Sequence, residues 1–211
     1  MNTQSSQTPL ESIAKDDMAG HYEVSLNDTE TNKEAQKDPE VTTLITLFNS
    51  TFENFNTRLV LGDDEPIYLP AGADKSYHQI VFAHGFFSSA LHEIAHWCIA
   101  GEKRRLLEDY GYWYCPDGRD ELQQADFEKV EIKPQAIEWA FTEAAGRKFQ
   151  VSTDNLNGAE PDREGFTRNV AAQLERFREH GFPPRAERFI TALLSTFGEE
   201  KAPQETGVDA A

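Results

Sequence analysis

The sequence predicts a single domain of the α+β class, mostly helical, in which one helix carries a metal-binding pattern. Three observations lead to this prediction. Apolar residues recur at helical spacing in several segments between residues 41 and 197, whereas short apolar runs with strand character lie between residues 58 and 85. The length of 211 residues suits one domain with a sizeable core. Residues 92–96 read His-Glu-Ile-Ala-His, the H-E-x-x-H pattern of the zinc peptidases called zincins.

Both ends of the chain are expected to lie outside this domain. Residues 1–40 are rich in Ser, Thr, Asn, Gln and acidic residues, and Tyr22 is their only aromatic residue. Such a segment cannot bury enough apolar surface to offset the entropy lost on ordering. We therefore predict a disordered acidic extension at residues 1–40, a folded domain at residues 41–198, and a second disordered tail at residues 199–211.

The first half of the domain is predicted to contain two helices and three short strands. Apolar residues in 41–52 follow helical spacing and indicate an amphipathic helix. Residues 58–61 and 67–69 are expected to be strands around a Gly-Asp-Asp-Glu-Pro turn, and residues 78–85 form a third apolar run. The next helix is expected to start with Ser88 or Ser89 as its N-cap and to stop at Gly101.

The second half is predicted to be helical apart from its connections. The charged segment after Gly101 is expected to continue as a helix, and residues 111–120 to form an aromatic loop or strand. From Asp120 to Gly146 the pattern indicates one helix or two, because Pro134 removes an amide donor and could open a second helix. Residues 151–158 are expected to form a loop or short strand, followed by helices at 166–181 and 184–197.

The composition restricts the classes of partner. The formal net charge of −17 disfavours non-specific binding to nucleic acid and suits a cationic substrate. No apolar run of about 18 residues predicts a membrane span. The start of the chain lacks the pattern of a signal peptide. The two cysteines are too few for a disulfide framework. We therefore expect a cytoplasmic protein that binds neither membrane nor nucleic acid.

His92 and His96 are the strongest candidates for metal ligands. Residues four positions apart project from the same face of a helix, so both imidazoles can reach one ion. The opposite face is apolar and would anchor the helix in the core; its residues are Leu91, Ile94, Ala95 and Cys98.

A third protein ligand is expected from a later helix. Glu131 is the preferred candidate, because it lies between two apolar residues and a buried carboxylate needs a partner. Glu138 is the next candidate, while Glu128 and His84 are also possible ligands.

Two histidines and a carboxylate suit more than one function. With zinc and a bound water they would hydrolyse amides, with Glu93 as the general base of a metallopeptidase. With Fe(II) they match the facial triad of oxygenases. A metal-stabilised binding module is a third hypothesis, although an open coordination position favours an enzyme.

The sequence also resembles a known family, the bacterial elongation factor P hydroxylases. The resemblance rests on long blocks between residues 41 and 197, which read FNTRLVLGDDEPIYLPA, IVFAHGFFSSALHEIAHWCIAG, YGYWYCPDGRD, VEIKPQA and ERFITAL. It implies a metal-dependent monooxygenase that hydroxylates the β-lysyl-modified lysine of elongation factor P. It further implies Fe(II) as the metal and molecular oxygen as co-substrate.

Carried onto this chain, the resemblance implies His92, His96 and Glu131 as the metal ligands, with Glu93 orienting a histidine or a bound water. A cationic substrate also needs acidic neighbours, and two turns offer them. The candidate substrate-binding residues are Asp63, Asp64 and Glu65 in the first turn, Asp117 in the second, and Tyr68 packing on the lysine stem.

Overall fold

The computed structural model describes residues 38–73, 75–108 and 117–198. Within these residues it contains five α-helices and one three-stranded sheet, which confirms a mostly helical α+β domain. The predictions for residues 1–37 and 199–211, and for residues 111–116 of the aromatic segment, lie outside the described residues. The likeness to zincins remains an interpretation of the five-residue pattern.

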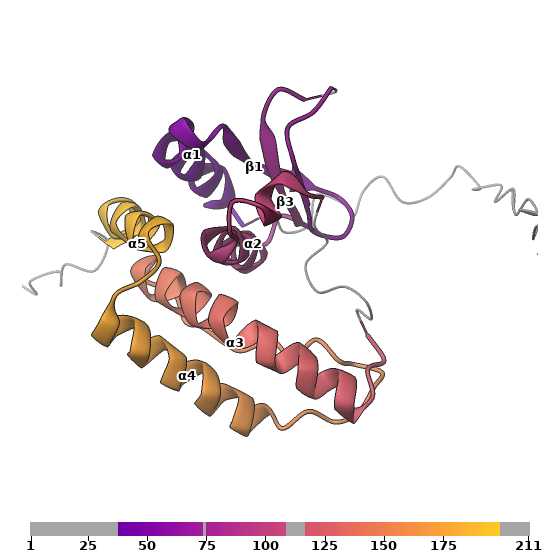
Figure 1. Cartoon of the computed structure of the whole chain (residues 1–211). Helices are drawn as coiled ribbons and strands as arrows, with labels where there is room; N and C mark the ends of the chain where they lie inside the picture. Colours follow the sequence, from indigo (N-terminus) through magenta and orange to yellow (C-terminus); the bar gives the residue numbers. More distant parts are fainter. Residues whose placement is uncertain (1–37, 74, 109–116, 199–211) are drawn as a thin grey trace, which may run out of the picture. The chain divides into compact units, whose positions relative to one another are not determined.

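The elements follow one another along the chain as shown in Figure 1. Two 3-10 turns, at Glu53–Phe55 and Arg104–Leu106, connect them. The helices and strands are α1 (Val41–Thr51), β1 (Thr57–Gly62), β2 (Ile67–Leu69), β3 (His78–Ala83), α2 (Phe87–Ile99), α3 (Glu121–Ala144), α4 (Arg163–His180) and α5 (Pro184–Phe197).

The sheet places β3 at its centre, in the order β1-β3-β2. β1 is parallel to β3 and β2 is antiparallel to it, so that Leu59 and Tyr68 both lie opposite Ile80. The two strands predicted around the turn at 62–66 are therefore present, but each pairs with β3 instead of with the other. Because β3 leads into α2 after three residues, the sheet fixes the start of the helix that carries the histidines.

The ends of α2 differ from the prediction. The helix begins at Phe87 with Phe86 at the N-cap and no side-chain cap, because the hydroxyl of Ser89 accepts the amide of Ala83 at 3.3 Å instead. It ends at Ile99, two residues before Gly101. The charged segment that follows forms only the 3-10 turn at Arg104–Leu106 and does not continue the helix.

α3 is one helix that passes through Pro134, so of the two alternatives, one helix or two, the single helix is confirmed. Asp120 and Gln123 form a reciprocal capping box at its start. The proline removes one backbone hydrogen bond. Ala136 and Ile137, which follow it, are fully buried, and this packing holds the helix continuous across the break.

The core lies between the sheet and the helices. The apolar face of α2 is buried as predicted, and it packs in one cluster with Ile137 and Phe141 of α3 and Phe189 of α5. α4 packs along α3 (Figure 1) and begins at Arg163, three residues before the predicted start, because Asp162 caps it. Among the described helices, none combines the length and apolarity needed to span a membrane.

Candidate metal centre

Two facing helices bring polar side chains into the core. α2 presents His92 and His96, which lie one turn apart. α3 presents Glu131, Gln135 and Glu138, which follow the i, i+4, i+7 spacing of one helix face and are each at most 8% exposed. A buried polar stripe of this kind requires partners, and the histidines of α2 supply them.

The three predicted ligands converge. Nε2 of His96 lies 3.0 Å from Nε2 of His92 and 3.2 Å from Oε1 of Glu131, and Nε2 of His92 lies 3.5 Å from Oε2 of Glu131. Ligands about 2.0–2.1 Å from one ion are separated from each other by roughly 3.0–3.4 Å. One donor atom from each residue lies within 4.8 Å of the other two, so the spacing fits a single ion.

The carboxylate of Glu131 gives a second indication. The side chain is only 4% exposed, and its buried Oε2 has no hydrogen-bond partner among the described residues. A buried carboxylate oxygen without a hydrogen bond costs free energy, and a cation between the three side chains would remove this cost. The donor set of two imidazoles and one carboxylate therefore fits a divalent metal ion.

Glu138 has a different place in the site. Nδ1–H of His92 donates a hydrogen bond to its Oε2 at 2.8 Å, which leaves Nε2 of His92 directed towards Glu131. Glu138 thus lies outside the converging group. Glu128 and His84 are not among the converging residues either. Glu128 accepts a hydrogen bond from the side-chain amide of Gln124. His84 lines the same cavity, and its backbone has a positive φ of 57°.

The charges of the site are strongly coupled. Burial disfavours the charged form of His92, but its hydrogen bond to Glu138 and the nearby charges of Glu138, Glu131 and Glu93 prevail and raise the pKa of His92 to about 10. Burial likewise opposes ionisation of Glu131, yet the two imidazoles lower the pKa of Glu131 to about 2. The metal-free site therefore holds a protonated His92 beside an ionised Glu131 at neutral pH.

Metal binding is expected to release a proton and to strengthen as the pH rises. A metal ligand must be a neutral imidazole, whereas His92 stays protonated until the pH passes its raised pKa of about 10. The affinity should accordingly increase by up to about tenfold per pH unit between roughly pH 6 and 9. Calorimetric titration with zinc in buffers of different ionisation enthalpy measures the released protons. An affinity independent of pH in this range would contradict the assignment.

The converging residues open into a cavity of about 380 Å³. Five acidic residues line it, and the described lining contains neither lysine nor arginine. These acids are Glu65, Glu93, Glu131, Glu138 and Asp154. The cavity therefore attracts cations, and Phe127 adds an aromatic surface on which an aliphatic stem can pack.

The structure distributes the predicted substrate-binding residues differently. Asp63 and Asp64 are exposed and belong to the lining of neither of the two cavities beside α2, while Glu65 of the same turn lines the metal cavity. The carboxylate of Asp117 accepts the backbone amide and the side-chain amide of Asn157. Tyr68 lines the second cavity, described below.

Asp154 was not predicted, because a loop positions it. Its φ of +46° is unusual for a residue other than glycine. The buried guanidinium of Arg119 donates to the carbonyls of Thr153 and Asp154 at 3.0 and 2.6 Å and stacks on the ring of Phe127. Arg119 thus fixes one wall of the metal cavity without lining it. Gln135 was missed too, but the helical spacing of 131, 135 and 138 could have revealed it.

The loop wall is held from α3 as well. The side-chain amide of Gln135 donates to the carbonyl of Ser152 at 2.8 Å and accepts the amide of the same residue at 3.0 Å. Ser152 lines the metal cavity, so a residue of the buried α3 stripe sets the distance between loop and helix.

The fold and the site together define a class: a helical α+β domain in which two histidines and a glutamate of neighbouring helices converge within an acidic cavity. Comparison with known proteins adds the family. The model of the elongation factor P hydroxylase family matches residues 47–206. The chain belongs to this family.

A curated relative has the same description. The chain is 54% identical over 158 residues to a protein of Haemophilus influenzae named elongation factor P lysine hydroxylase. The matched region covers 74% of this chain and 89% of the relative. It is therefore long enough to include nearly the whole of the relative.

Proposed function

We propose that this chain hydroxylates a lysine of elongation factor P. The family match and the name of the Haemophilus relative support this activity. The observation that carries the proposal is the convergence of His92, His96 and Glu131 in a cavity lined by acids, because it combines a metal donor set with a surface for a cationic side chain.

The metal is proposed to be Fe(II), held by His92, His96 and Glu131. The close spacing of the donor atoms and the oxygen of Glu131 that lacks a hydrogen bond support a bound cation. An iron ion held by these two histidines and the glutamate would supply oxygen chemistry, with molecular oxygen as co-substrate. Glu138 holds the ring of His92 in place through Nδ1.

The acidic wall of the metal cavity, formed by Glu65 and Asp154, is proposed to bind the substrate. Glu65 and Asp154 lie in the lining together with the metal-site residues, so they can pair with an ammonium group while the lysine stem packs on Phe127. A β-lysyl group on the lysine would add further cationic charge, which suits a cavity with five acids. We propose this modified lysine as the substrate and the cytoplasm as the site of action.

The metallopeptidase hypothesis has less support. It requires Glu93 as general base, and Glu93 does line the metal cavity. Burial raises the pKa of Glu93 although the two imidazoles lower it. The family match and the name of the relative describe a hydroxylase, however. We therefore assign Glu93 a supporting role at the site.

The function is tested with β-lysylated elongation factor P as substrate. Incubation with the iron-loaded protein, oxygen and a two-electron reductant such as ascorbate should add one oxygen atom of O2 to the modified lysine while the other leaves as water, as measured by intact-protein and peptide mass spectrometry. The zinc-loaded protein and an oxygen-free reaction serve as controls and should leave the substrate unchanged. Cleavage of the substrate, or no mass gain with iron, oxygen and the reductant, would contradict the proposal.

A further inference from the structure

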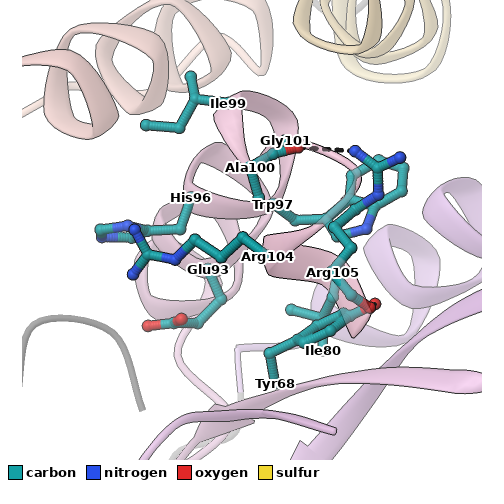
Figure 2. A pocket seen from close by; sticks show the side chains of 10 residues that line it. All are labelled: Tyr68, Ile80, Glu93, His96, Trp97, Ile99, Ala100, Gly101, Arg104 and Arg105. Carbon is teal, nitrogen blue, oxygen red and sulfur yellow. Dashed lines mark hydrogen bonds between the residues drawn. The ribbon is translucent and has the colours of Figure 1, made fainter. Parts of the chain in front are cut away.

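A second cavity, of about 260 Å³, lies at the C-terminal end of α2, and Figure 2 shows it from close by. Tyr68 of β2, Trp97 of α2 and Arg105 of the following turn are among the residues that line it. His96 lines both this cavity and the metal cavity, so the end of α2 forms part of the metal centre. The contacts that hold this end therefore bear on the geometry of the metal ligands.

His96 belongs to the last turn of α2. The backbone amide of Ala100 donates to the carbonyl of His96 at 3.1 Å and closes this turn. The carbonyls that follow have no partner within the helix, as at every helix C-terminus. Nε2 of His96 lies 3.2 Å from Oε1 of Glu131 on α3, so a shift of this turn would change the distance between two of the three converging residues.

Arg185, the second residue of α5, supplies partners for these carbonyls. Its Nη2 donates to the carbonyls of Trp97, Cys98 and Ala100 at 2.8, 3.0 and 2.6 Å. Its guanidinium also lies over the ring of Trp97, 4.7 Å from the ring centroid. A residue of one helix thus satisfies the free carbonyls of another.

Arg105 brings a second guanidinium to the same place. Its Nη1 donates to the carbonyl of Ala100 at 2.6 Å, and this hydrogen bond is dashed in Figure 2. The hydroxyl of Tyr68 donates in turn to the carbonyl of Arg105 at 3.0 Å. The end of α2 is therefore joined to α5 through Arg185, and to the sheet through Arg105 and Tyr68.

The two guanidinium groups are close enough to repel each other. Burial and the charge of Arg105 both lower the pKa of Arg185. The carbonyl end of a helix carries a partial negative charge, and its attraction for cations offsets this repulsion. Both positive charges thus act on the end of α2, and neither arginine lines the metal cavity.

We propose that Arg185, assisted by Arg105, is a positioning residue of the metal centre. By holding the last turn of α2 it fixes His96 relative to Glu131, and so contributes to metal affinity without being a ligand. The proposal rests on the metal centre of the proposed function and deepens it, because it assigns the residues that keep one ligand in place.

Arg185→Gln is expected to weaken zinc binding by about tenfold, the lower end of the loss found for residues that orient a ligand. Competition with a chromophoric chelator measures the affinity, and circular dichroism verifies the fold. Cobalt(II) gives a second measurement, because its visible absorption depends on the arrangement of its ligands and should differ in the variant. Arg185→Lys keeps the charge and Arg105→Gln keeps Arg185, so each should lose less affinity than Arg185→Gln.

Two controls separate positioning from a loss of stability. Arg188→Gln makes the same change at an exposed position of α5, where Arg188 donates to Asn54, and should bind zinc like the unmodified protein. Leu174→Ala leaves a cavity in the buried cluster between α4 and α3. It should lower the free energy of unfolding without changing the affinity of the folded protein for zinc.

Unchanged zinc affinity and an unchanged cobalt spectrum in folded Arg185→Gln would overturn the proposal. An equal loss of affinity in Leu174→Ala would overturn it too, because the effect would then follow stability. If Arg185→Gln does not fold, the same criteria apply to Arg185→Lys and Arg105→Gln. These measurements use neither oxygen nor elongation factor P, so failure of the proposed hydroxylation and failure of this proposal are separate results.

Discussion

Replacing Glu131 by glutamine is expected to abolish metal binding at working concentrations and, with it, the proposed hydroxylation. The substitution keeps the size of the side chain but removes the one anionic donor of the converging group. Loss of a residue that only orients a ligand costs about 10–100-fold in metal affinity, and loss of the ligand itself should exceed this. We therefore expect the affinity of Glu131→Gln to fall by more than about 100-fold.

Glutamine is preferred to a histidine deletion for this test. Removal of His92 would leave Glu138 without its hydrogen-bond donor and Glu131 with His96 alone, and removing one partner of a buried pair costs about 3–5 kcal/mol. Glu131→Gln avoids an uncompensated buried charge, so the fold should persist.

Competition with a chromophoric chelator measures the metal affinity of this variant, and circular dichroism verifies its fold. Glu121→Gln, at the exposed start of α3, is the matched control and should bind metal like the unmodified protein. A folded Glu131→Gln protein that retains metal and still oxidises elongation factor P would remove the basis of the site.

Replacing Glu138 by alanine is expected to weaken metal binding by about 10–100-fold without abolishing it. Glu138 accepts Nδ1–H of His92 and so fixes the orientation of the ring, while Nε2 remains available for the metal. Glu138→Gln retains an acceptor oxygen and should lose less affinity than Glu138→Ala. The loss of metal affinity should be largest in Glu131→Gln, smaller in Glu138→Ala and smallest in Glu138→Gln. This order distinguishes a metal ligand from a residue that positions one.

The ionisation of His92 gives a second measurement for Glu138. In the metal-free protein the hydrogen bond and charge of Glu138 contribute to the pKa of about 10. Both variants should lower the pKa of His92, which NMR titration of the imidazole follows. If Glu138→Ala loses metal as completely as Glu131→Gln, Glu138 is itself a ligand. If neither affinity nor pKa changes, it has no positioning role.

The sequence indicated the three converging residues because most of their geometry is local. His92 and His96 are related by one helical turn, so the pattern alone fixes their relative positions. Glu131 comes from a separate helix, and only its apolar sequence neighbours indicated burial. The choice between Glu131 and Glu138 depends on the rotation of α3 against α2, which follows from tertiary packing.

The acidic wall was harder to predict. Asp63, Asp64 and Asp117 were chosen as acids in turns, but the position of a turn side chain depends on contacts distant in sequence. The carboxylate of Asp117 is hydrogen-bonded to Asn157, forty residues later in the chain. The position of Asp154 is fixed by the buried guanidinium of Arg119, which donates to its carbonyl. The pairing of β1 and β2 with β3 is also non-local, so the strands were predictable and their neighbours were not.

Because the candidate metal ligands lie on two separate helices, metal binding depends on how these helices pack against each other. Leu91, Ile94, Ile137 and Phe141 belong to the apolar cluster that holds α2 and α3 together. A bound ion would lie between the two helices, and this apolar contact would set the distance between its ligands. A change that loosened this contact by a fraction of an ångström would weaken metal binding while both helices kept their hydrogen bonds, so loss of the ion would precede unfolding.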